Sequence, residues 1–223
     1  MGNCGGRTTF ESTIDDFFLE ANLNHLNSHE VQMLITNNIT NNQFCENKLE
    51  VFKANIADYL KSFSEQPEIR EKTALFWQNS FEKSLEPKSQ LYFLCCLCFL
   101  CNYDKFTLHR SFFSIAKFFG YQQQAENSNF IEKKDLRDII DFYLRFITVT
   151  VLEYFRQTVK GNDDLCQTLT IVYRDEVRKI FLDNMMVKYE EKVDLEKFFV
   201  TEMDQLNHVN ARSKFQEIHL KLE

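Results

Sequence analysis

The chain has 223 residues, of which 44% are hydrophobic and 26% are charged, and its formal net charge is −7. This length allows one sizeable core or two small lobes, and this composition is typical of a folded globular protein. Binding to nucleic acid requires a clustered basic face that displaces counterions from the phosphates. The sequence contains no such cluster, so we expect no nucleic-acid partner.

Segments that direct a chain into or across a membrane follow recognisable patterns. The longest apolar run, "LYFLCCLCFLC" at residues 91–101, is shorter than the roughly 20 apolar residues that cross a bilayer. The first residues show no apolar core of a signal peptide. The seven cysteines are odd in number and lack the regular spacing of a disulfide framework, which favours a reducing compartment. We therefore expect an intracellular, cytoplasmic protein.

Apolar residues recur at helical spacing through the first 120 residues. Asn27 and Glu30 fit a capping box, Pro67 suits a first helical turn, and Gly120 suits a helix C-terminus. Glycine and proline are too sparse for β-hairpins. The predicted helices cover residues 10–21, a segment from residue 27, residues 49–60 and 67–81, a segment after Pro87, and residues 108–119.

A polar stretch, "YQQQAENSN", separates these helices from the rest of the chain. A long helix is predicted from about Ile131 to Val159, ending before Gly161, and two or three more helices follow. The sequence thus predicts an all-α, two-lobed helical array. The expected segments are a flexible leader at 1–8, an N-terminal lobe at 9–120, a linker at 121–130 and a C-terminal lobe at 131–223.

Two short segments resemble each other. "KFTLHRSFF" (105–113) and "KVDLEKFFV" (192–200) both contain lysine, an apolar residue, an N-cap residue, leucine and later phenylalanine. A helix, a short loop with one apolar residue, a cap and a second helix are the order of an EF-hand. Phe106 and Val193 are then expected to form the small β-contact that pairs two hands. Coincidence in a phenylalanine-rich helical protein is the alternative.

Neither candidate loop has the ligands that calcium requires. An EF-hand loop places oxygen ligands at positions 1, 3, 5 and 12 and glycine at position 6. With Val193 at position 8, Met186, Lys188 and Lys197 occupy positions 1, 3 and 12. Placing Gly120 or Gly161 at position 6 gives no cation cage either. The loops are therefore expected to be degenerate, without a bound metal.

Several segments in order resemble a known family. They are "MGN", "HEVQMLI", "KLEVFKANIADYL", "KSQLYFLCCLCFLC" and "KFTLHRSFFSIAKFF". Over residues 9–206 the chain resembles the EF-hand-like N-terminal half of TLDc-domain proteins and, more distantly, calcineurin B and recoverin-type sensors. This resemblance implies a helical fold, and several members of those families are N-myristoylated.

The sequence begins "MGNCGGR", with three of its five glycines among these residues. Gly2 meets the first requirement of N-myristoylation, although Gly6 stands where Ser or Thr is usual. A single myristoyl chain binds membranes only marginally, so stable anchoring requires a second signal. Arg7 is the only Lys or Arg within residues 1–30, which leaves palmitoylation of Cys4 as that signal. A disordered leader without lipid is the alternative.

Other reactive-looking motifs have simpler interpretations. Cys95, Cys98 and Cys101 recur at three-residue spacing along one helix face, with Cys96 beside them. Zinc requires four converging ligands and no second arm is visible, so buried core cysteines are the favoured interpretation, with metal binding or acylation as alternatives. His109 and Ser111 follow each other too closely to form a catalytic pair on a helix. We expect no enzyme activity, no cofactor and no metal.

These patterns together predict a membrane-anchored, non-calcium-binding EF-hand-like adaptor or regulatory subunit at the cytoplasmic face of a membrane. Its partner would be a protein, for example an amphipathic helix that enters an apolar groove. Its acyl chains would contact the membrane surface. The alternative is a structural subunit of a large ciliary or mitochondrial assembly without a lipid anchor.

Overall fold

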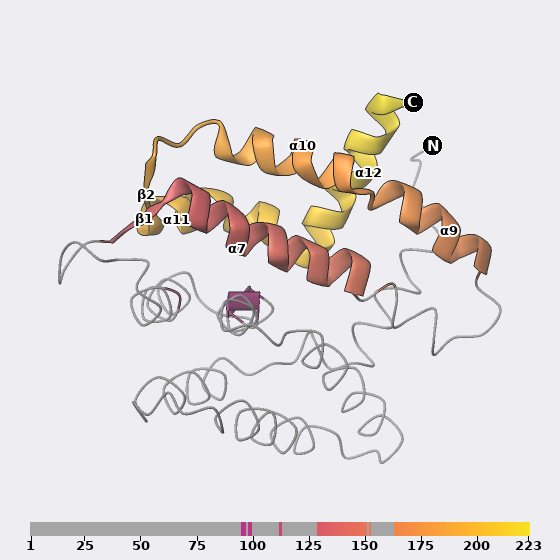
Figure 1. The fold of residues 1–223 in the computed structure, drawn as a ribbon, viewed down its shortest axis with the longest axis horizontal. Coiled ribbons are helices and arrows are strands. Elements are labelled where there is room, and N and C mark those ends of the chain that lie inside the picture. Colours follow the sequence, from indigo (N-terminus) through magenta and orange to yellow (C-terminus); the bar gives the residue numbers. More distant parts are fainter. Residues whose placement is uncertain (1–94, 97, 100–111, 113–128, 151, 153–162) are drawn as a thin grey trace, which may run out of the picture.

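The computed structural model describes residues 95–96, 98–99, 112, 129–150, 152 and 163–223 (Figure 1). These residues are mostly helical, which confirms the predicted helical fold class, and they include one short pair of strands. The elements in chain order are β1 (Phe130–Glu132), α7 (Lys133–Arg145), the π-helix η1 (Phe146–Thr150), α9 (Asp163–Val172), α10 (Asp175–Met186), β2 (Lys192–Asp194), α11 (Leu195–Leu206) and α12 (His208–Leu222).

The two strands pair antiparallel in a short sheet that lies beside the start of α7 and the end of α10 (Figure 1). Ile131 lies opposite Val193, and both side chains are buried, whereas the flanking Phe130 and Glu132 are exposed. Val193 was predicted to lie in a β-contact, and it does. Its partner in the described residues is Ile131, whereas Phe106, the partner predicted from sequence, lies outside them.

Each strand leads directly into a helix. The amide of Lys133 donates to the carbonyl of Glu191 at 2.7 Å, and the amide of Leu195 donates to the carbonyl of Asn129 at 2.9 Å. The side chain of Asp194 accepts a hydrogen bond from the amide of Lys197 at 3.2 Å, which makes Asp194 the predicted N-cap of α11. The sheet therefore holds the N-termini of α7 and α11 together.

The helix predicted from Ile131 begins two residues later, at Lys133, because Ile131 belongs to β1. Its buried side chains recur at helical spacing, from Leu136 to Leu144. The chain then widens into η1, where the hydroxyl of the buried Thr148 donates to the carbonyl of Leu144 at 2.6 Å. Such a bond satisfies a hydroxyl that would otherwise be buried without a partner.

Helix α10 connects α7 to α12 in the described C-terminal part. It packs against both of these helices, and α12 also contacts α9 and α11 (Figure 1). Asn207 separates α11 from α12 and accepts a hydrogen bond from the amide of Val209 at 3.0 Å. The N-cap allows a sharp change of direction, so α12 returns to cover α10.

Phenylalanine and tyrosine side chains connect distant parts of the described chain. Phe99 contacts Phe112, Tyr143 and Phe199, with ring centroids 5.8, 4.7 and 6.0 Å away. Phe112 also lies 5.0 Å from Phe199, edge to face. Aromatic rings prefer such tilted and edge-to-face contacts. This cluster, named the aromatic cluster below, attaches the helical residues 98–99 to α7 and α11.

Candidate functional site

The loop between α10 and β2, residues 187–191, has the contacts expected of a fixed loop. The ammonium group of Lys133, at the start of α7, donates to the carbonyl oxygen of Tyr189 at 2.7 Å. The amide of Tyr189 donates to the carbonyl of Met186 at 3.1 Å. The loop is therefore held from α7 and from the end of α10.

A buried carboxylate provides the third attachment. Glu202 of α11 is fully buried, and its Oε1 atom accepts hydrogen bonds from Nζ of Lys188 at 2.6 Å and from the hydroxyl of Tyr189 at 2.8 Å. Its Oε2 atom accepts from Nε2 of Gln205 at 3.0 Å. A buried carboxylate is costly unless it is paired and hydrogen-bonded. These three donors satisfy that requirement, and Lys188, Tyr189, Glu202 and Gln205 are named the loop lock.

The Tyr189 hydroxyl is also affected by the buried Glu202 carboxylate. Burial and the hydrogen bond to the Glu202 carboxylate raise the pKa of the Tyr189 hydroxyl well above its ordinary value of 10.0. A phenol that donates to a carboxylate must keep its proton. Tyr189 thus acts as a neutral donor in the loop lock, and Lys188 supplies the positive charge.

The two predicted loop positions occupied by lysine have different roles in the structure. Lys188, at position 3 of the degenerate loop, is bound to Glu202, whereas Lys197, at position 12, is exposed on the first turn of α11. In the part of the chain that the structure describes, no three His, Cys, Asp or Glu side chains converge as metal ligands.

A second buried charge lies between α7 and α10. Arg178 is 3% exposed, and its Nε atom donates to Oδ1 of Asp141 at 2.7 Å. Its Nη2 atom lies 2.9 Å from Oδ1 of Asp175, and Arg145 approaches the same two carboxylates at 3.7 and 4.0 Å. Because two aspartates already neutralise Arg178, this cluster joins the helices and does not present a free cation to an anionic ligand.

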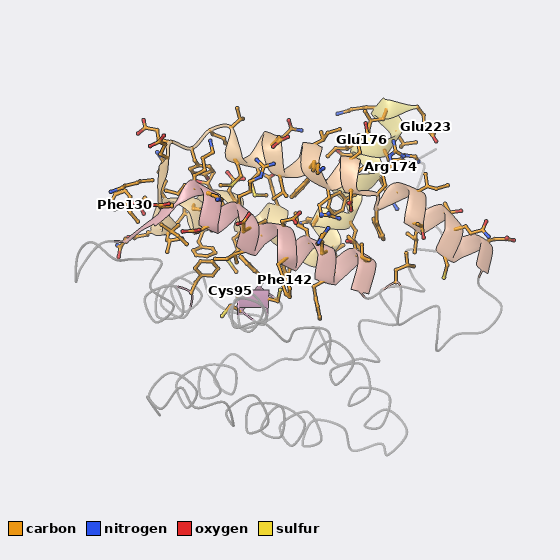
Figure 2. All side chains as sticks on the ribbon, in the orientation of Figure 1. Cys95, Phe130, Phe142, Arg174, Glu176 and Glu223 are labelled. Carbon is orange, nitrogen blue, oxygen red and sulfur yellow. The ribbon has the colours of Figure 1, made fainter. Side chains whose placement is uncertain are left out.

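A third cluster of polar side chains lies where the start of α10 meets the end of α12 (Figure 2). Arg174 lies 3.3 Å from Glu176, and its Nη1 atom lies 3.1 Å from Nδ1 of His219. Arginine only donates, so Nδ1 accepts, and Nε2 then carries the proton toward Glu223 at 3.4 Å. The contacts fix the end of α12 against the start of α10.

The cysteine-rich segment belongs to the core. Cys95, Cys96 and Cys98 are fully buried, and Cys95 is drawn below α7 in Figure 2. Burial raises the pKa of all three thiols well above the ordinary value of 9.0, and this suppresses the reactive thiolate. The interpretation of these three residues as core is confirmed, and Cys101 lies outside the described residues.

The predicted lipidation residues, Gly2 and Cys4, also lie outside the described residues. No helix within the described ranges is long and apolar enough to cross a membrane. The acylation of Gly2 and Cys4 therefore remains a prediction from sequence.

The sequence analysis did not predict the loop lock or Arg178. One signal was available for Glu202, because the buried residues of α11 recur at helical spacing and Glu202 occupies one of these positions. A carboxylate within an apolar stripe indicates a buried partner for its charge. The pattern does not identify that partner, which comes from a loop that precedes the helix.

Comparisons with known proteins returned no match: no family model matches the chain, and neither the curated proteins nor the solved structures include a significantly similar protein.

Proposed function

We propose that this protein is a non-calcium-binding EF-hand-like adaptor or regulatory subunit that is anchored at the cytoplasmic face of a membrane. The pairing of Ile131 with Val193 is the observation that carries the EF-hand part of the proposal. Each of these residues lies in a three-residue strand that leads into a helix, and α10 precedes the second strand. Two helix–loop–helix units paired through their loops have this order.

The calcium-independent part is supported by the chemistry of the 187–191 loop. Lysines 133 and 188 bring ammonium groups to this loop. An incoming Ca²⁺ ion would be repelled by these charges, and the buried carboxylate of Glu202 is already used by Lys188 and Tyr189. A calcium sensor requires oxygen ligands at positions that include 1, 3 and 12 of the loop, which Met186, Lys188 and Lys197 do not supply, so this unit would act as a fixed scaffold.

An adaptor of this kind binds a protein. Paired helix–loop–helix units bind amphipathic helices through apolar grooves, and the proposed partner is such a helix. The membrane part of the proposal rests on Gly2 and Cys4, where a myristoyl chain and a palmitoyl chain together would give stable anchoring.

Calorimetry of the full chain with CaCl₂, after treatment with a chelator, tests the calcium-independent part. We expect no site tighter than the millimolar range of the weakest dedicated calcium modules. A micromolar site would contradict the proposal and restore a calcium-sensor function.

The N-terminal mass of protein isolated from eukaryotic cells tests the anchor. A myristoyl group on Gly2 supports membrane anchoring. An unmodified N-terminus favours the second candidate, a structural subunit of a large assembly, in which the glycine-rich leader contacts neighbouring proteins.

A further inference from the structure

Glu202 is unusual among the carboxylates of the described chain because it is completely buried. Its strongest donor is Lys188, whose side chain is 44% exposed and whose Nζ atom reaches Oε1 at 2.6 Å. Lys188 belongs to the loop and Glu202 to the third turn of α11. The contact therefore fixes the loop to a helix turn that lies 14 residues further along the chain.

Lys188 supplies a positive charge to Glu202 as well as a hydrogen bond. Tyr189 and Gln205 can donate to the carboxylate, but both are neutral, so neither balances its charge. An uncompensated buried charge is strongly destabilising, whereas a neutral group of the same shape in its place is tolerated. The stability of the closed loop should therefore depend on the Lys188 ammonium as long as Glu202 carries its charge.

We infer that the buried Glu202 carboxylate, held in place by hydrogen bonds from Tyr189 and Gln205, is a binding site for an ammonium group, and that Lys188 occupies this site from within the chain. The internal ammonium ion fixes the 187–191 loop against α11, as a bound metal ion fixes the loop of a metal-binding hand. This inference deepens the calcium-independent part of the proposed function, and its biological meaning rests on that proposal. The contacts themselves do not depend on which partner the protein binds.

A double-mutant cycle on the full chain isolates the interaction. The variants are Lys188→Met, which keeps the length of the side chain and removes the charge, Glu202→Gln, which keeps the shape, and the double variant. Lys188→Arg retains a cation, and Lys197→Met removes an exposed lysine from the same loop unit as the matched control. The readout is hydrogen exchange of the amides of Tyr189 and Lys133, which donate to Met186 and Glu191 at the two ends of the loop.

Lys188→Met should increase the exchange rate of these amides by at least about tenfold, because it leaves the Glu202 charge without a counterion. The double variant should recover most of the protection, and Lys188→Arg should stay near the wild type. If Lys188→Met prevents folding while the double variant folds, the inference is supported in the same way.

Three results would overturn the inference. The first is an amide exchange rate in Lys188→Met that equals the rate in Lys197→Met. The second is that the effects of Lys188→Met and Glu202→Gln on exchange simply add in the double variant, and the third is that neither Lys188→Met nor the double variant folds. None of these results depends on calcium binding by the wild type. Calcium calorimetry can therefore contradict the proposed function while the double-mutant cycle supports the loop lock. Conversely, the cycle can contradict the loop lock while calorimetry supports the proposed function.

Discussion

Ile131 and Val193 face each other across the antiparallel pair of β1 and β2, although α7, α9 and α10 lie between them in the chain. Both side chains are about 1% exposed. The pair is the only strand contact within the described residues, and it sets the positions of α7 and α11. Packing of this pair, together with the aromatic cluster, therefore holds α7 against α11.

The first prediction concerns this pair. Ile131→Ala should lower the free energy of unfolding by about 2–5 kcal/mol, because it leaves a cavity where no solvent enters. Val187→Ala is the matched control, since Val187 is 77% exposed in the adjoining loop and should change stability by no more than about 0.5 kcal/mol. Urea unfolding followed by circular dichroism measures both, and equal stabilities would contradict the role of the strand pair.

The strand of Val193 could be predicted from sequence, whereas its partner could not. The order Lys192–Val193–Asp194 places an apolar residue before a good N-cap, which is a local signal. The partner depends on long-range pairing, and Phe106 was chosen because its segment resembles that of Val193. Ile131 was assigned to a helix because its strand has only three residues and is followed at once by the apolar stripe of α7.

The candidate site was less predictable than the fold. Helical periodicity indicates which residues of α11 are buried, including Glu202, but it does not show that Lys188 reaches it from the preceding loop. In the sequence, the lysines at loop positions 3 and 12 indicate a degenerate loop without a bound metal. Only coordinates distinguish Lys188, which pairs with a buried acid, from Lys197, which is exposed.

The second prediction concerns the buried thiols. Cys95, Cys96 and Cys98 should react with iodoacetamide far more slowly in the native protein than in urea, because burial raises the pKa of each thiol and blocks access. Labelling for short times, followed by mass spectrometry of the peptides, measures the three sites separately. Rapid labelling of the native protein at Cys95 would contradict the core assignment.

A matched pair of variants sharpens this test. Phe199→Ala removes a fully buried ring from the aromatic cluster and should lower the free energy of unfolding by about 3–5 kcal/mol. Because labelling of the buried cysteines requires the core to open, their labelling rate should rise in this variant. Val200→Ala alters the exposed neighbour on α11 and should leave the labelling rate unchanged. Equal rates in the two variants would mean that the cluster does not protect the thiols.

The third prediction is a dependence of stability on pH. The hydrogen bond and charge of Arg178 hold the pKa of Asp175 below its ordinary value of 3.8. Because the pKa is lower in the folded state, the stabilisation is present above the unfolded pKa and is lost as pH falls through the folded pKa. Asp175→Asn should therefore flatten the acid limb of the stability curve below about pH 4.

The effect of Asp175→Asn at neutral pH should be small, within about 1 kcal/mol, because the carboxylate is 65% exposed and screened by solvent. Asp164→Asn, at an exposed position of α9, corrects for the loss of one negative charge. Thermal unfolding between pH 2 and pH 7 compares the two variants. Identical acid limbs would show that Arg178 does not stabilise Asp175 in the folded state.

The last prediction tests the proposed lipid anchor at the start of the chain. Gly2→Ala should abolish membrane association, because the acyltransferase requires an N-terminal glycine and palmitoylation usually follows membrane contact. Cys4→Ser should leave only weak, reversible binding, since one myristoyl chain gives a partition constant on the order of 10⁴ M⁻¹. Acidic residues between Glu11 and Glu30 oppose rescue by anionic lipids.

Fractionation of cells that express the wild type and each variant separates the possible outcomes. A graded loss, from wild type through Cys4→Ser to Gly2→Ala, supports two acyl chains acting together. If all three proteins sediment equally with membranes, the glycine-rich leader is not the anchor. If none does, the leader acts in contacts between proteins, and the assembly subunit becomes the better account of the chain.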